Sequence, residues 1–200
     1  MMKLKSKGCN VYLTRLNERI FLIDTGMDGK MVAEQIKELD GIIITHAHFD
    51  HIAGARDIER TFGCPVFAHP DDIPYILREK DFTYSGILGK IVKFVEKMTK
   101  FSPPENLKSV LDLKEIKILH TPGHTPGSIC IFEGEKVYCG DLLRGNAKLS
   151  HKSFCSDYGK YLDSVRTFLN LEWKTAFPGH GGEIEKSFAL KKLKKFLKII

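Results

Sequence analysis

The chain has 200 residues and a formal net charge of +6, with 31 lysine and arginine residues against 25 aspartate and glutamate residues. Six of the lysines lie between positions 186 and 200, where no acid occurs, so the first 185 residues hold 25 basic and 25 acidic residues. This neutral body excludes the uniformly basic surface of most nucleic-acid-binding proteins, and a hydrophobic content of 42% excludes a disordered chain.

Strands and helices alternate in the first part of the chain. The hydrophobic patterns predict strands over 11–16, 19–23, 41–45 and 64–68, and helices over 30–39 and 51–62. Asn17 and Glu18 join the first two strands as a hairpin turn. The strand over 41–45 is apolar on both faces, which is typical of a buried strand in a parallel sheet.

The second part of the chain continues this alternation. Residues 71–108 have a mostly helical pattern, and we predict strands over 116–119, 128–132, 137–140 and 175–177, and helices over 161–171 and 188–200. No repeat or linker is present, so residues 1–200 are expected to form a single α/β (α+β) domain.

Two segments leave a choice of roles. The aromatic residues of 71–108 either form a lid over a functional site or pack a helical insert onto the core, and we favour the insert. The basic segment 186–200 is expected to be a packing helix with lysines on its solvated face, rather than a membrane or RNA contact.

The chemistry of the sequence concentrates directly after the strand over 41–45. Residues 45–51 read Thr-His-Ala-His-Phe-Asp-His, so three of the eight histidines fall within six residues, together with an aspartate. In an extended loop, positions 46, 48 and 50 point the same way, so His46 and His48 can converge on one ion while Asp50 and His51 face a neighbouring one. Packing alone does not explain such a cluster.

Three further metal-binding side chains follow predicted strands in the same manner. His124 and His180 each follow a Pro-Gly pair, and Asp141 follows Gly140. Taken singly, each is compatible with an ordinary turn or helix cap. Together with the residues of 45–51, they give five imidazoles and two carboxylates on strand-end loops, which indicates a metal-dependent active site.

These motifs resemble the metallo-β-lactamase fold superfamily. The segment 45–51 matches its H-x-H-x-D-H motif, and IDTG at 23–26, TPGHTPGS at 121–128, CGD at 139–141 and FPGHG at 177–181 follow in the family's order. The nearest resemblance is to glyoxalase II, a hydroxyacylglutathione hydrolase. The resemblance implies a four-layer αβ/βα sandwich with the metals at the edge of two packed sheets.

The resemblance also implies a role for each matching residue. His46, His48 and His124 are expected to bind one metal ion, and Asp50, His51 and His180 a second. Asp141 is expected to bridge both ions, and Asp24 matches an acid that orients the ligand loop from outside the ligand set. The catalytic residues in this scheme are Asp50 and Asp141.

The donor set favours a hydrolytic reaction. Nitrogen and oxygen ligands suit two divalent ions, most simply Zn²⁺, with Fe and Mn as alternatives. A hydroxide bridging the ions would attack the carbonyl of a thioester, ester or lactone. Substrate contacts are expected from the loop after Asp141, where the candidates are Arg144, Lys148, His151 and Tyr158.

Two other functions remain as alternatives. The first is an oxidoreductase similar to the persulfide dioxygenases, which would hold one iron on His46, His124 and Asp141. The second is a nucleic-acid-processing metallohydrolase, which the neutral body disfavours. We expect a small-molecule substrate, no membrane partner and a cytoplasmic location, because no apolar run approaches the ~18 residues that span a bilayer and no apolar stretch follows the basic N-terminus. The oligomeric state is left open.

Overall fold

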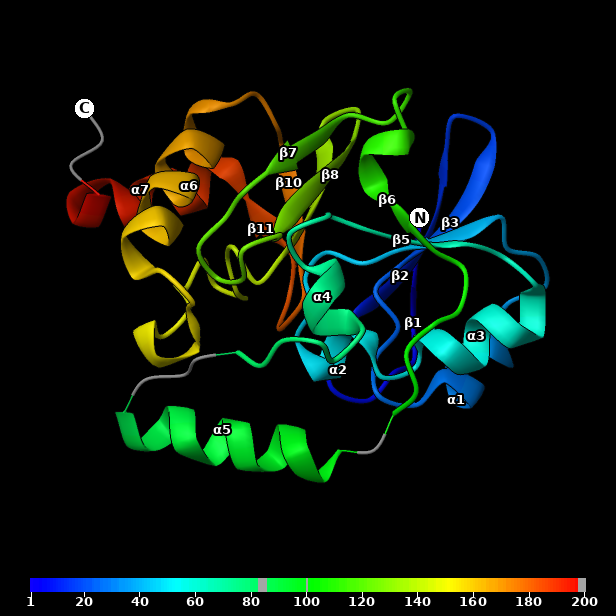
Figure 1. The fold of residues 1–200 in the computed structure, drawn as a ribbon. Helices are drawn as coiled ribbons and strands as arrows, with labels where there is room; N and C mark the ends of the chain where they lie inside the picture. Colours follow the sequence, from blue (N-terminus) through cyan, green and yellow to red (C-terminus); the bar gives the residue numbers. More distant parts are fainter. Residues whose placement is uncertain (83–85, 100, 198–200) are drawn as a thin grey trace.

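The computed structural model describes residues 1–82, 86–99 and 101–197 of the chain. Two β-sheets lie against each other in its centre, with helices on the outer face of each (Figure 1). The first sheet has six strands in the order β1-β2-β3-β4-β5-β6. These strands span β1 (Met2–Leu4), β2 (Val11–Leu16), β3 (Arg19–Ile23), β4 (Gly41–Ile43), β5 (Val66–Ala68) and β6 (Leu107–Ser109).

The second sheet has five strands in the order β11-β10-β9-β8-β7. Its strands span β7 (Ile118–His120), β8 (Ile129–Glu133), β9 (Lys136–Gly140), β10 (Thr175–Pro178) and β11 (Ile184–Glu185). The helices are α1 (Gly29–Ala33), α2 (Phe49–Ile52), α3 (Ala55–Phe62), α4 (Ile73–Ile76), α5 (Gly86–Met98), α6 (Tyr158–Asn170) and α7 (Lys186–Leu197), with short 3₁₀ turns η1 (Val110–Asp112) and η2 (Lys152–Phe154).

Three hydrophobic clusters hold these elements together as four layers. Phe21 and Ile43 of the first sheet meet Tyr138 and Phe177 of the second in the central cluster. A second cluster packs α1 and α3 onto the first sheet, and a third packs α6 and α7 onto the second sheet. Each fully buried large apolar side chain stabilises the fold by roughly 1.5–3 kcal/mol. The predicted four-layer α/β sandwich is therefore confirmed.

Strand direction brings the ends of several strands to one edge of this sandwich. In the first sheet β3 is parallel to β4, and in the second β9 is parallel to β10. Since β7 and β9 are both antiparallel to β8, they also run in the same direction. The carboxyl ends of parallel strands lie at the same edge of a sheet, so the loops that follow β3, β4, β7, β9 and β10 are gathered there.

The structure corrects several predicted elements. Strands β1, β6 and β11 were not predicted, and the helix predicted over 51–62 is two helices, α2 and α3. The break falls at Gly54, whose backbone N–H donates to Gly26 O at 2.9 Å, outside the helix. The helix predicted over 30–39 ends at Ala33, because Gln35 N and Ile36 N bond three residues back, to Val32 O and Ala33 O.

The segment 71–108 is only partly a packed insert. Phe82 is buried in the core beside α4, whereas Phe94 and Met98 on α5 are 66% and 67% exposed, so these two do not pack onto the core. Tyr84 lies outside the described residues. Figure 1 shows α5 running along one side of the molecule, away from the sheets.

The basic C-terminal helix packs as predicted over its described part. Leu193 of α7 is buried against the second sheet, while residues 198–200 lie outside the described residues. Among the helices that the structure describes, none is long and apolar enough to cross a membrane.

Candidate metal centre

Seven predicted side chains meet at the edge where the strand ends gather. They lie on five segments, each a loop or a short helix, that follow strands of both sheets. His46 and His48 follow β4, Asp50 and His51 lie on α2, His124 lies between β7 and β8, Asp141 follows β9, and His180 follows β10.

Three of the histidines form one group. The ligand atoms of His46, His48 and His124 lie within 4.8 Å of one another. The ring centroids of His46 and His48 are 4.9 Å apart, and those of His48 and His124 are 4.5 Å apart. All three residues are buried. This is the trio that the resemblance to the metallo-β-lactamase superfamily implies for one ion.

Asp50, His51 and His180 form the neighbouring group. His180 Nε2 lies 3.2 Å from Asp50 Oδ2, and His51 Nε2 lies 3.9 Å from the same oxygen. Asp50 and His51 belong to the single turn of α2, where His51 N donates to His48 O at 2.9 Å. The predicted extended conformation of position 50 is therefore wrong, although the predicted separation of the two groups is retained.

The carboxylate of Asp141 lies between the two groups. Its Oδ2 is 3.7 Å from His124 Nε2 and 3.5 Å from His180 Nε2, and its Oδ1 is 3.8 Å from His51 Nε2. A single carboxylate thus faces both groups.

Unpaired atoms test whether this cluster fits divalent ions. Within the described part of the chain, His46 Nε2, His124 Nε2 and Asp141 Oδ1 are buried without a hydrogen-bond partner. A buried polar atom without a partner costs about 1–3 kcal/mol. A divalent cation would satisfy such imidazole and carboxylate atoms, so the residues present fit the metal ions that the fold implies.

The local electrostatics favour the ligand form of these histidines. Burial lowers the pKa of His46 and His124 well below the usual value and lowers the pKa of His48 to about 4. Burial opposes ionisation of Asp50, but the charges of His51 and His180 outweigh it and hold the pKa of Asp50 below its usual range. Neutral imidazoles and an ionised carboxylate are the forms that bind metals.

Asp24 and Thr45 fix the protonation of two histidines. Asp24 Oδ1 accepts from Thr45 N, and its Oδ2 accepts from Thr45 Oγ1 and His51 Nδ1, each at 2.8 Å. Because a carboxylate only accepts, His51 carries its proton on Nδ1. Thr45 Oγ1 donates to Asp24, so it accepts from His46 Nδ1 at 3.0 Å. Nε2 of His46, whose pKa is lowered, is thereby left unprotonated and directed at the cluster. Burial opposes protonation of His51, but its negative neighbours, Asp24 and Asp50 among them, raise its pKa, so a cation bound there would replace the proton on Nε2.

Cys155 has the same relation to His124. Its Sγ donates to His151 O at 3.7 Å and lies 3.8 Å from His124 Nδ1. The sulfur can therefore accept a hydrogen bond from the Nδ1–H group of His124, which leaves Nε2 of this ring facing Asp141. No local pattern indicates this role for Cys155, because it lies 31 residues from His124 along the chain.

A cavity of about 200 Å³ opens onto the cluster. Its walls include Arg144, Phe49 and Phe154 beside five of the seven clustered side chains. Arg144 Nε lies 4.0 Å from Asp141 Oδ2. The other predicted substrate contacts, Lys148, His151 and Tyr158, line a separate cavity against α7.

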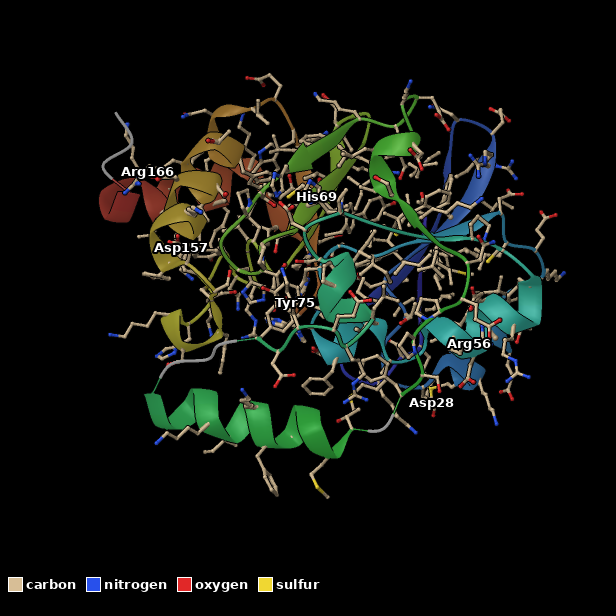
Figure 2. The ribbon with its side chains drawn as sticks, viewed as in Figure 1. Asp28, Arg56, His69, Tyr75, Asp157 and Arg166 are labelled. Carbon is tan, nitrogen blue, oxygen red and sulfur yellow. The ribbon has the colours of Figure 1, made fainter. Side chains whose placement is uncertain are left out.

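Aromatic residues also contact the site, among them Phe82, which belongs to the segment predicted to be either a lid or, as favoured, a packed insert. Phe82 meets the His48 ring at 5.1 Å between centroids and stacks on Tyr75 of α4 at 4.2 Å between centroids. Figure 2 labels Tyr75 on α4. Phe154 of η2 and Phe49 of α2 line the cavity. The start of the segment 71–108 thus contacts the site directly. Of the supporting residues that the sequence analysis did not assign to the site, Thr45 could have been found from the sequence, because it immediately precedes His46.

Comparisons with known proteins agree with this arrangement. The family model described as "Metallo-beta-lactamase superfamily" matches residues 5–180. A probable metallo-hydrolase of Methanocaldococcus jannaschii is 27% identical, over 98% of this chain and all of that protein. A hydroxyacylglutathione hydrolase of Haemophilus influenzae is 30% identical, over 74% of this chain and 72% of that one. The crystal structure of the protein TTHA1623 in a di-iron-bound form has a TM-score of 0.75 at 24% identity and covers 94% of each chain.

Proposed function

Because the chain belongs to the metallo-β-lactamase superfamily of hydrolytic enzymes, we propose that it is a binuclear zinc hydrolase that cleaves a thioester, ester or lactone bond. The observation that supports this most directly is the cluster of five imidazoles and two carboxylates, in which all but Asp50 and His180 are buried and Asp141 faces both groups. The hydroxyacylglutathione hydrolase among its relatives supports the thioester class.

In this proposal each group of the cluster holds one ion. His46, His48 and His124 would bind the first ion, Asp50, His51 and His180 would bind the second, and Asp141 would help to hold both. Ions bound there supply Lewis acidity and lower the pKa of coordinated water towards neutrality. Nitrogen and oxygen donors favour zinc but also accept iron, which the di-iron neighbour contains.

The protein's own residues prepare the site for this chemistry. Asp24 and Thr45 hold the Nδ1 protons of His51 and His46, so that both rings present Nε2. Asp50 is held in its ionised form, which is the form that binds a metal ion, and it lines the cavity beside His180. Phe49 and Phe154 form an apolar wall for the acyl group.

Metal analysis beside a substrate panel tests the function. We expect about two zinc ions per chain and zinc-dependent hydrolysis of S-lactoylglutathione or a lactone, lost on chelation and restored by zinc. About one iron per chain, with thiol-dependent uptake of O₂ and no hydrolysis, would contradict the proposal and support the persulfide dioxygenase alternative.

Arg144 is the substrate contact that we retain from the four predicted ones. Its guanidinium lies at the cavity, and a charged hydrogen bond to a substrate oxygen contributes about 1.5–3 kcal/mol. Since the side chain is 38% exposed, we expect the lower part of this range. Arg144→Ala should raise KM for anionic substrates about tenfold and leave kcat within about twofold.

Lys148→Ala is the matched control in the same loop. Lys148 lines the separate cavity against α7, so its removal should leave both constants unchanged. A KM that rises equally in both variants, or in neither, would contradict the assignment of Arg144.

A further inference from the structure

A third aspartate close to the site has no place in the proposed chemistry. Asp72 lies between β5 and α4 and is 1% exposed. It occupies the N-cap position of α4, yet its side chain makes no capping hydrogen bond to that helix. The carboxylate is instead turned towards other parts of the chain.

The two oxygens of Asp72 connect the two loops that hold the first group of histidines. Oδ2 accepts from Ala47 N at 2.8 Å and from Thr125 Oγ1 at 2.6 Å, and Oδ1 accepts from Gly127 N at 2.6 Å. Ala47 stands between His46 and His48, and Thr125 follows His124 directly. One carboxylate thus spans loops that belong to different sheets.

The packing around Asp72 leaves it little freedom to move. A Cβ on Gly127 would lie 2.7 Å from Asp72 Cγ, so only glycine allows this approach. Thr125 Oγ1 also lies 2.8 Å from Ser128 Oγ, which fixes the hydroxyl that meets Asp72. Burial raises the pKa of Asp72 to about 6, although the hydrogen bonds that its carboxylate accepts act to lower it. A carboxylate buried at this cost is stable only while its oxygens are paired.

We propose that Asp72 is a positioning residue that holds the loop of His46 and His48 at a fixed distance from the loop of His124. This role rests on the proposed function, because the geometry it fixes is that of the first ion's ligands. Hydrogen bonds to groups outside a ligand set orient metal ligands, and their loss typically weakens metal affinity about 10- to 100-fold.

The test replaces Asp72 by asparagine and measures zinc affinity by competition with a chromophoric chelator. The amide keeps one acceptor, but its NH₂ group faces either Gly127 N or the Ala47 and Thr125 donors, so at least one bond is lost. Asp72→Asn should bind its tighter zinc ion about 10- to 100-fold more weakly, and kcat should fall while KM changes little.

Glu59→Gln is the matched control for loss of a buried carboxylate. Glu59 is 5% exposed and accepts from Arg56 and from the backbone N–H groups of Glu105 and Asn106, none of which belongs to a histidine loop. This variant should lower the unfolding midpoint in urea without changing zinc affinity. If Glu59→Gln weakens zinc binding as much as Asp72→Asn, the effect is general destabilisation and the positioning role is overturned.

Variants of Thr125 keep the proposal testable even if Asp72→Asn does not fold. Thr125→Val removes the hydroxyl that donates to Asp72 and should weaken zinc affinity, whereas Thr125→Ser keeps it and should restore wild-type affinity. Wild-type protein that binds no zinc would overturn the proposed function itself. Wild-type protein that binds zinc, with unchanged affinity in both Asp72→Asn and Thr125→Val, would overturn only the positioning role.

Discussion

Asp141→Asn is expected to lower kcat by about 10³-fold or more, because this carboxylate would help to hold both metal ions and a bound metal ion contributes several kcal/mol to stabilising the transition state. Its oxygens lie 3.5–3.8 Å from Nε2 of His51, His124 and His180. The amide is neutral, and its NH₂ group would point a donor at atoms that are proposed to bind cations. The measurement is kcat on the best substrate of the panel, with zinc content determined on the same samples.

Asp157→Asn is the control for this substitution. Asp157 lies at the N-cap of α6 on the surface (Figure 2), where its Oδ1 accepts from Lys160 N at 3.1 Å. Asparagine caps helices about as well as aspartate, so stability and activity should both be retained. Wild-type turnover by an Asp141→Asn enzyme that holds two zinc ions would exclude the binuclear mechanism.

The central strands could be predicted from the sequence because each is a short apolar run that ends in a glycine or polar turn. The missed strands lack that pattern. Met2 of β1 is 50% exposed, and β6 and β11 lie at sheet edges with three and two residues respectively. Edge strands bury few side chains and are defined by backbone pairing with a distant partner, which a local pattern does not contain.

The candidate ligands were predictable for a related reason. All of them lie in the segments that follow β4, β7, β9 and β10, and the ends of these strands meet at a common edge, so local sequence indicates that these residues meet. The supporting contacts are of another kind. Asp72 meets Thr125 across 53 residues, and Cys155 meets His124 across 31, so only the folded chain shows them. Arg144 and Lys148 are both basic residues in the loop after Asp141. Only the structure shows that Arg144 lines the cavity at the cluster, whereas Lys148 lines the separate cavity against α7.

Gly179→Ala is the second variant from which we expect a large effect, through steric overlap alone. A Cβ at this position would lie 2.5 Å from His51 Cε1 and 2.6 Å from Asp141 Oδ1. The backbone cannot easily move away, because Gly179 N donates to Gly140 O and Asn10 N donates to Gly179 O, both at 2.7 Å. The new methyl group therefore displaces His51 or Asp141, both of which belong to the proposed ligand set.

Displacement of a ligand by about 1 Å typically lowers activity about 10²-fold, and overpacking costs about 1–3 kcal/mol. Gly179→Ala should accordingly lose at least about 10² in kcat, bind about one zinc ion instead of two, and unfold at lower urea. Gly182→Ala, in the same loop, is the control. Among the described residues, no heavy atom outside its chain neighbours lies within 4 Å of its added Cβ. This variant should therefore match the wild type in kcat, zinc content and urea stability. Full zinc content and turnover in Gly179→Ala would show that His51 and Asp141 need not hold the positions that the structure gives them.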